Sequence, residues 1–296
     1  MVRVILLVLL PVALSAAGLK IDHVTVAGAD LKKMQASLAA VGIQTVYGGA
    51  HSNHATEMAL VSFRDGTYLE LIAPQPAGDP QAIEKHEWAR FMKGNSGPCA
   101  WAASEKDLAA EVKRLQAAGI AVSPPVKSGR QRPDGVRLEW ETSEIGVDTR
   151  GTFFPFLIQD FTLRKQRAFP RGKPVSTDFH GVTRVVIAVK DLDAAFKRYQ
   201  QAYGAPPPIK QVDKDFEAYL ALPGGLPVVL AQPLNEQSWL SSRIRKLGEG
   251  PCAFVLGGAN ASHVKGVSKS RWFSADISWF DPEKLGWFLG FEADGR

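Results

Sequence analysis

Ile21-Asp22-His23-Val24-Thr25-Val26 is an apolar strand pattern whose surroundings recur three more times along the chain. In this first copy, Asp30-Leu31 follows at the start of a helix pattern and Gly42-Ile43 follows at its end. The later copies begin near Cys99, Arg184 and Gly250, and the last of them is degenerate. Because one such unit is too small to bury its own apolar face, we expect the copies to pair, with a functional site in the cleft between two of them.

Each complete copy has the order strand, helix, strand, strand, strand. In the first copy, residues 31–41 place apolar side chains at helical spacing, and Gly42 is a typical helix stop. Two strand-like stretches and the turn signal Asp65-Gly66 then precede a last strand at residues 67–72. The chain therefore predicts an α+β protein of tandem βαβββ modules, at residues 20–75, 97–160, 180–234 and from 250 onward.

The first 17 residues have the pattern of an export signal. Arg3 supplies the positive end, residues 4–14 are apolar, and Ser15-Ala16-Ala17 offers small residues for cleavage. This apolar stretch is shorter than the roughly 20 residues that span a bilayer, so we expect no stable membrane span. We expect an exported protein, periplasmic or secreted, whose mature chain begins near Gly18. An uncleaved anchor or a buried first strand is the alternative.

The composition is that of an ordinary globular protein of about two domains. The 296 residues contain 35 Lys and Arg against 30 Asp and Glu, for a net charge of +5. Because the basic residues are scattered, we expect no nucleic-acid partner. Cys99 and Cys252 are the only cysteines and have no metal-binding or redox spacing, so we expect two buried free thiols.

The predicted organisation is a signal peptide at 1–17, a first domain at 18–160, a linker at 161–179 and a second, degenerate domain at 180–296. The linker contains two prolines and a cluster of basic residues. We interpret this cluster as a solvated tether.

Three strings in the first half carry a resemblance to a known family. They are Ile21-Asp22-His23-Val24, then Tyr47-Gly48-Gly49-Ala50-His51 with the later strand at 65–72, and finally Arg130-Gln131-Arg132-Pro133-Asp134-Gly135 with Trp140 shortly after. In this order the chain resembles the vicinal-oxygen-chelate superfamily, which includes glyoxalase I, extradiol dioxygenases and bleomycin-resistance proteins, and most closely its glyoxalase-like branch. The resemblance covers residues 20–160, and 180–296 in outline. It implies two glyoxalase-like domains, each with paired modules that form a cupped mixed sheet around the site.

The resemblance also implies a metal site. In metal-using members the ligands come from the first and last strands of each module, which here carry His23 and Glu70. An imidazole and a carboxylate suit a divalent metal such as Zn, Mn, Fe or Ni. His51 would complete a two-His-one-carboxylate set, and Glu70 is also the candidate catalytic acid or base. The alternatives are a hydrogen-bonded structural pair of His23 with Glu70, and a solvent-exposed loop position for His51.

The other modules depart from this pattern. When the Asp-Leu strings are superposed, Ala100 falls opposite His23, and when the last strands are aligned, Phe156 falls opposite Glu70. In the second pair of modules, the same two positions hold Arg184 and Val229. A four-ligand glyoxalase I site cannot be assembled from these residues.

Arg130 and Arg132 are candidate substrate-binding residues on a predicted turn. Two guanidinium groups can grip a carboxylate or phosphate with fork geometry. Trp101 and Trp140 are candidate walls of an apolar pocket. The alternative is a salt bridge between an arginine and Asp134 that stabilises the hairpin.

Three functions remain open at this stage. The first is an exported metal-dependent enzyme, of lyase, isomerase or dioxygenase type, acting on a small oxygen-rich or anionic substrate. The second is a metal-free small-molecule binding protein similar to bleomycin-resistance proteins, with a pocket lined by Trp101, Trp140 and Phe156. The third is a structural module without a concave pocket. A small-molecule ligand is the expected partner in the first two cases, and a homodimer is left open.

Overall fold

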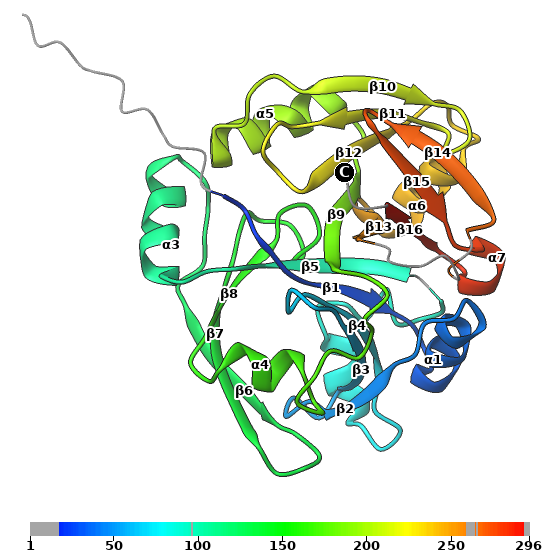
Figure 1. The fold of residues 1–296 in the computed structure, drawn as a ribbon. Helices are drawn as coiled ribbons and strands as arrows, with labels where there is room; N and C mark the ends of the chain where they lie inside the picture. Colours follow the sequence, from blue (N-terminus) through cyan, green and yellow to red (C-terminus); the bar gives the residue numbers. More distant parts are fainter. Residues whose placement is uncertain (1–17, 96, 259–263, 265, 293–296) are drawn as a thin grey trace, which may run out of the picture.

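The computed structural model describes residues 18–95, 97–258, 264 and 266–292 and contains two eight-stranded sheets, one before and one after the segment 161–179 (Figure 1). Each sheet is cupped and carries helices, which confirms the predicted α+β fold of paired βαβββ modules. The predicted signal peptide lies outside the described residues. No described helix has the length and apolar character needed to cross a membrane.

The first sheet has the spatial order β2-β3-β4-β1-β5-β8-β7-β6. Its strands are β1 (Ile21–Ala27), β2 (Val46–Ala50), β3 (Thr56–Ser62), β4 (Tyr68–Pro74), β5 (Gly97–Ser104), β6 (Val126–Gln131), β7 (Arg137–Glu144) and β8 (Phe156–Asp160). Antiparallel β1 and β5 form its centre, and each pairs in parallel with the last strand of its own module. The two modules are therefore joined through their first strands.

The strand register agrees with the equivalences read from the sequence. Thr25, two residues after His23, pairs with Glu70. Ala102, two residues after Ala100, pairs with Phe156. Ala100 and Phe156 therefore occupy the places that His23 and Glu70 occupy in the first module.

The repeated Asp-Leu string marks the start of each module's helix. Asp30, Asp107 and Asp191 are the N-caps, and each side chain accepts a hydrogen bond from a backbone N–H of the first turn. The helices that follow are α1 (Leu31–Ala40), α3 (Leu108–Ala117) and α5 (Leu192–Tyr203). The shorter helices α2 (Pro80–Lys85) and α4 (Arg164–Ala168) belong to the connections around the first sheet.

The second sheet repeats the same order, β10-β11-β12-β9-β13-β16-β15-β14. Its strands are β9 (Gly181–Ala188), β10 (Ile209–Asp213), β11 (Ala218–Leu222), β12 (Val228–Pro233), β13 (Gly250–Gly257), β14 (Ser268–Trp272), β15 (Ala275–Trp279) and β16 (Phe288–Glu292), with α6 (Trp239–Leu247) and α7 (Pro282–Leu285). In the part of the chain that the structure describes, no helix joins β13 to β14. The fourth copy is thus a complete set of strands without its module helix.

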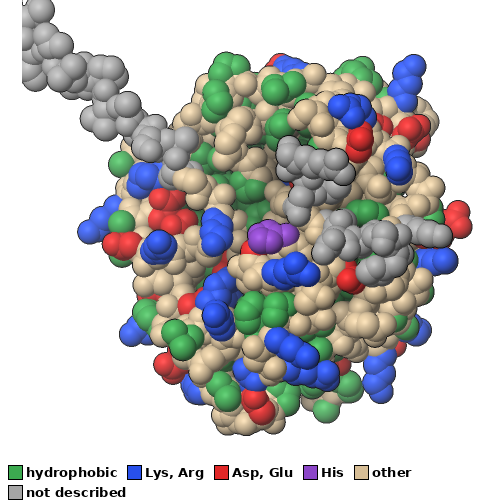
Figure 2. All heavy atoms as spheres, viewed as in Figure 1, with side chains coloured by type: hydrophobic (Ala, Val, Ile, Leu, Met, Phe, Trp, Pro, Cys, Tyr) green, Lys and Arg blue, Asp and Glu red, His purple; other side chains and the backbone are tan. Residues whose placement is uncertain are grey.

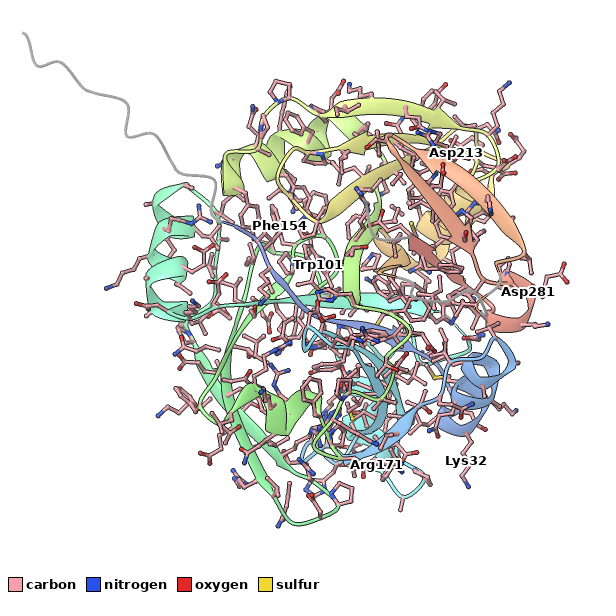
Figure 3. The ribbon with its side chains drawn as sticks, in the orientation of Figure 1. Lys32, Trp101, Phe154, Arg171, Asp213 and Asp281 are labelled. Atoms are coloured by element: carbon pink, nitrogen blue, oxygen red, sulfur yellow. The ribbon has the colours of Figure 1, made fainter. Side chains whose placement is uncertain are left out.

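The two sheets pack against one another through a shared core. Alternate residues of β1, such as Val24 and Val26, point into this core together with Val185 and Phe254 of the second sheet. Trp101 is fully buried in the same core, and Figure 3 shows it in the middle of the molecule. The opposite face of each sheet belongs to a separate cluster, so each concave face lies on the side away from its neighbour.

Both cysteines are buried and free, as expected. Each is the extra residue of a β-bulge, because the pairing of β1 with β5 shifts between Cys99's neighbours and that of β9 with β13 shifts around Cys252. Prolines precede both cysteines, and proline is tolerated within strands at such bulges. The Arg243 guanidinium donates to the carbonyl oxygens of Pro98 and Pro251, which links the two repeats.

The predicted solvated tether is wrong for part of the linker. Arg164 and Arg167 of α4 both pair with Asp22 at the start of β1, and Arg167 is only 3% exposed. A buried guanidinium requires a carboxylate partner, and two are present, because Arg167 also pairs with Asp160 at 2.6 Å. The basic cluster therefore holds the segment after β8 against the first sheet.

Candidate metal and substrate site

A cavity of about 180 Å³ lies in the cup of the first sheet. Its ionisable lining residues are His23, His51, Glu70, His86, Glu87, Arg130, Arg150 and Arg167. A pocket of this chemistry disfavours a purely structural module. The cavity is smaller than the roughly 300 Å³ at which drug-sized ligand sites begin, so it suits a small molecule.

The cup closes where its two edge strands meet. Arg130 of β6 donates to the carbonyl oxygen of Gly48 in β2 at 2.5 Å. Beside it, Gly49 adopts a φ of +113°, and a Cβ there would lie 3.5 Å from the Pro133 ring. Gly49 lies within β2 beside a bulge at Gly48, and glycine adopts its left-handed backbone without strain.

His23, His51 and Glu70 come together at one wall of the cavity. The Nε2 atom of His23 lies 3.9 Å from one Glu70 carboxylate oxygen, and the Nε2 atom of His51 lies 3.8 Å from the other. Glu70 Oε2 also accepts a hydrogen bond from the Thr25 hydroxyl at 3.2 Å. The three residues come from β1, β4 and the β2–β3 connection.

Each histidine is oriented through its other ring nitrogen. His23 Nδ1 lies 2.6 Å from the Asp22 carboxylate, and His51 Nδ1 lies 2.8 Å from the Thr56 hydroxyl. A β-bulge between Ile21 and His23 makes Asp22 the extra residue of β1, which allows its carboxylate to reach the neighbouring imidazole. A carboxylate on Nδ1 leaves Nε2 as the lone-pair nitrogen, the arrangement that metal-binding histidines use.

The His23 ring is also fixed by aromatic contacts. It stacks on Tyr68 with ring centroids 4.7 Å apart and contacts Phe156 edge-on at 5.4 Å. The Tyr68 hydroxyl accepts a hydrogen bond from Arg167 at 2.6 Å. These neighbours hold the imidazole in one orientation before any ligand binds.

Two pKa shifts describe the charge around these residues. Burial alone would raise the pKa of Asp22, but Arg167, Arg164 and the hydrogen bond from His23 lower it well below its usual range. Burial lowers the pKa of His51, and Arg130 lowers it further, against the opposing effect of Glu70. Asp22 is therefore ionised and His51 neutral at neutral pH, which are the forms that orient and donate to a metal.

The two imidazoles and the carboxylate are ligands that suit a divalent metal, but their donor atoms lie farther apart than the ligands of a bound ion. No group of three or more His, Cys, Asp or Glu in the described parts of the chain is drawn together tightly enough to hold an ion. Ligand atoms bonded at about 2.1 Å to one metal are separated by about 3.0–3.4 Å. The observed 3.8 and 3.9 Å separations are wider, so binding would require these side chains to close slightly around the ion.

The predicted substrate residues separate into two groups. Arg130 and Trp140 are among the described residues that line the cavity, whereas Arg132 and Trp101 are not. Arg132 pairs with Asp134 and donates to the Gln166 carbonyl at 2.9 Å, so it stabilises the hairpin, as the alternative interpretation had it. Trp101 faces the shared core because strand alternation turns its neighbours Ala100 and Ala102 toward the cavity side.

Sequence reasoning missed several residues of the cavity, among them His86, Trp88 and Arg150. The first two lie in the connection between the modules, and Arg150 lies in the loop before β8, where no periodic pattern draws attention to a side chain. The Trp88 backbone N–H donates to His86 Nδ1 at 3.1 Å. Burial, His51 and Arg150 together lower the pKa of His86 to about 4.

The comparisons with known proteins agree with this architecture. Residues 21–204 match the family described as glyoxalase-like domain. A crystal structure of a hypothetical protein from Staphylococcus aureus superposes with a TM-score of 0.63 at 15% identity, covering 93% of this chain and 99% of that one. The two-sheet fold is thus shared over nearly the whole length of both chains.

Two shorter structures match part of the chain. Methylmalonyl-CoA epimerase from Mycobacterium tuberculosis has a TM-score of 0.36 at 19% identity and covers 41% of this chain and 92% of its own. Streptomyces coelicolor methylmalonyl-CoA epimerase in complex with 2-nitronate-propionyl-CoA has a TM-score of 0.32 at 20% identity, covering 39% of this chain and 97% of its own. Among curated proteins, none matches this chain.

Proposed function

This chain belongs to the family of glyoxalase-like domains, and we propose that it is a divalent-metal-dependent enzyme acting on a small oxygen-rich or anionic substrate. One observation carries the proposal. The Nε2 atoms of His23 and His51 approach the Glu70 carboxylate at 3.9 and 3.8 Å on the wall of a small cavity. Two imidazoles and one carboxylate form the ligand set that leaves coordination positions open for substrate.

The side chains around the cavity have distinct roles in this proposal. His23, His51 and Glu70 would hold the ion, which would polarise substrate oxygens and stabilise the negative charge that develops on them. Arg130 adds a buried positive charge on the same cavity, which favours an anionic substrate. Glu70 is the candidate general base, because it is the carboxylate that the Thr25 hydroxyl orients within the cavity.

A metal-free binding protein is the second candidate function. Trp88, Trp140 and Phe156 give the cavity aromatic walls, which suits an apolar ligand. The second module also supplies Ala100 and Phe156 where further metal ligands would stand. This candidate requires no closure of the histidines around an ion.

The two functions are separated by a metal-dependent activity screen. The protein is stripped with chelator, reloaded separately with Zn, Mn, Fe or Ni, and assayed against small hydroxy and oxo acids and vicinal diols. We expect turnover with at least one metal and a loss of at least about 100-fold in Glu70→Gln, the scale of a removed general base. Turnover that is equal with and without metal, or unchanged in Glu70→Gln, would contradict the enzyme proposal.

We also propose that the protein is exported, to the periplasm or beyond the cell, after loss of residues 1–17. The support is the pattern of Arg3, an apolar stretch at 4–14 and small residues at 15–17. N-terminal sequencing of the chain from fractionated cells is expected to begin near Gly18. A chain that retains Met1 in the cytosolic fraction would contradict export.

A further inference from the structure

Arg150 carries an unexplained buried donor. Its Nε atom is buried and has no hydrogen-bond partner among the described residues, although the residue lines the cavity of the first cup. Leaving a buried charged donor unpaired costs free energy, so such groups in native proteins usually bind water, an ion or a ligand. The Nε atom itself is covered, but the Arg150 side chain is 21% exposed and lines the cavity, so an acceptor there would be met by its terminal N–H groups.

The ring of Phe156 lies between Arg150 and His23 and limits the distance from one to the other. The Arg150 guanidinium carbon is 4.1 Å from the centroid of this ring, and the His23 ring centroid is 5.4 Å from it. The guanidinium and the imidazole are thus separated by less than the sum of these two distances. One small molecule of three to five backbone atoms can reach both (about 1.5 Å per bond).

Two carboxylates position Arg150 without using its donors. Glu87 approaches the guanidinium at 3.9 Å and Glu144 at 3.8 Å, both longer than a hydrogen bond. Burial raises the pKa of Glu87, against the opposing effect of Arg150. The guanidinium therefore keeps N–H groups available for a ligand.

His86 supplies a second donor on the same cavity. Because the Trp88 backbone N–H donates to His86 Nδ1, the neutral imidazole carries its proton on Nε2. His86 and Arg150 both line the cavity, as does Trp88, whose indole Nε1 donates to the Arg150 carbonyl oxygen at 3.0 Å. The His86–Trp88 segment and the Arg150 loop are thereby held together.

We propose that Arg150 and His86 form a carboxylate subsite in this cavity, so that the substrate is a short carboxylic acid with an oxygen substituent at its other end. The carboxylate is bound by Arg150 and His86, and the oxygen substituent faces His23, His51 and Glu70. Arg130, whose guanidinium donates to the Gly48 carbonyl oxygen, also lines the cavity and adds a second positive charge suited to an acid. The subsite rests on the proposed function for the role of the oxygen end, but carboxylate binding by Arg150 requires no metal.

The test compares a carboxylate with its neutral amide. Binding of 3-hydroxybutyrate and of 3-hydroxybutyramide to the full chain is measured by ligand-observed NMR, as purified and again with EDTA. We expect the acid to bind at least about tenfold more tightly than the amide, since a charge-assisted hydrogen bond is the stronger one. Arg150→Gln is expected to remove this preference, and Arg150→Lys to retain part of it.

Arg137→Gln is the matched control. Arg137 is exposed on β7 and pairs with Glu139, so its loss removes one positive charge from the same domain without touching the cavity. It should leave the preference for the acid unchanged. Equal binding of acid and amide by the wild type, or a preference that survives in folded Arg150→Gln, would overturn the subsite.

The outcome is independent of the metal proposal. Metal content measured on the same samples tells the two apart, because Arg150 is not a ligand in the proposed set. If the wild type binds the acid through Arg150 but takes up no metal, the carboxylate subsite is supported and the proposal of a metal-dependent enzyme is contradicted. If the wild type takes up metal but does not prefer the acid over the amide, the metal site is supported and the carboxylate subsite is contradicted.

Discussion

The two cups share one framework and differ in what fills them. In the first, His23 and Glu70 face a cavity with ionisable walls. In the second, the equivalent positions hold Arg184, which pairs with Glu292 at 3.3 Å, and the fully buried Val229. The second concave face is occupied by aromatic rings, with Phe216 5.0 Å from Trp272 and 5.4 Å from Trp279 between centroids.

The framework is retained even where the site is lost. Both first strands carry the same bulge, which makes Asp22 the extra residue in β1 and Thr183 the extra residue in β9. Both sheets also close at their edges, through Arg130 in the first and through Gln211, which bonds the backbone of Arg271 and Phe273, in the second. Sheet closure is therefore a property of the fold, whereas the cavity lined by histidines, glutamates and arginines belongs to the first cup.

The charged side chains on the face shown in Figure 2 do not differ between the two halves as the residues of the two concave faces do. On the face shown in Figure 2, Lys and Arg side chains are spread among acidic and apolar ones instead of forming a single band. Substitutions in the two concave faces should reveal how the halves differ.

The largest effect is expected when a carboxylate is placed in the second cup. Val229→Glu copies Glu70 into a fully buried apolar cluster, where Val186 stands in place of Thr25. Arg184, at the position equivalent to His23, is already paired with Glu292. We expect a loss of about 3–5 kcal/mol in the free energy of unfolding, the cost of an uncompensated buried charge. Urea denaturation measures this loss. Val229→Thr is the isosteric control, and we expect it to lower the free energy of unfolding by about 1–2 kcal/mol. A cost for Val229→Glu no greater than for Val229→Thr would mean that the second cup still tolerates the site.

A smaller effect is expected at the bulge residue of the first cup. Asp22→Asn leaves Arg167 buried with Asp160 as its remaining carboxylate, which should cost about 2–4 kcal/mol at pH 7. The folded pKa of Asp22 lies well below its unfolded value, so its contribution is complete above that unfolded value and declines as the pH falls below about 4. The difference in the free energy of unfolding between the wild type and Asp22→Asn, measured by urea denaturation, should therefore become smaller in acid. Thr183→Ala, at the same bulge of the second sheet, should cost less than about 1 kcal/mol.

The smallest effect concerns His86. Its folded pKa of about 4 lies below the unfolded value near 6.5, so the unfolded chain takes up a proton first as the pH falls. The free energy of unfolding should therefore decrease from pH 6.5 to 4, with part of the slope absent in His86→Gln. Denaturation in EDTA at several pH values measures the difference between the two slopes. Parallel curves would show that His86 is not held neutral by its surroundings.

The sequence predicted the framework better than the site. Periodic apolar residues and the repeated Asp-Leu strings locate the modules, because helix periodicity and strand alternation are local properties. The same alternation could have excluded Trp101 from the pocket, since it follows Ala100 by one residue on a strand. His86 and Arg150 were not predictable in this way, because irregular connections carry them to the cavity through contacts distant in sequence.

Arg167 illustrates the same limit. The three residues before it, 164–166, are polar or basic, which is typical of an exposed segment. Burial follows from Asp22 and Asp160, whose carboxylates are brought to it from β1 and β8. When the partners of a charged side chain come from other strands, its burial cannot be predicted from the residues around it in sequence.

Metal analysis tests the difference between the cups most directly. The mature protein is purified without chelators or a metal-binding tag, beside His23→Ala/Glu70→Ala in the first cup and Arg184→Ala/Val229→Ala in the second. We expect about one metal ion per chain in the wild type and in the second-cup variant, and none in the first-cup variant. No metal in any of them after addition of Zn, Mn, Fe and Ni, or metal retained by the first-cup variant, would contradict the account.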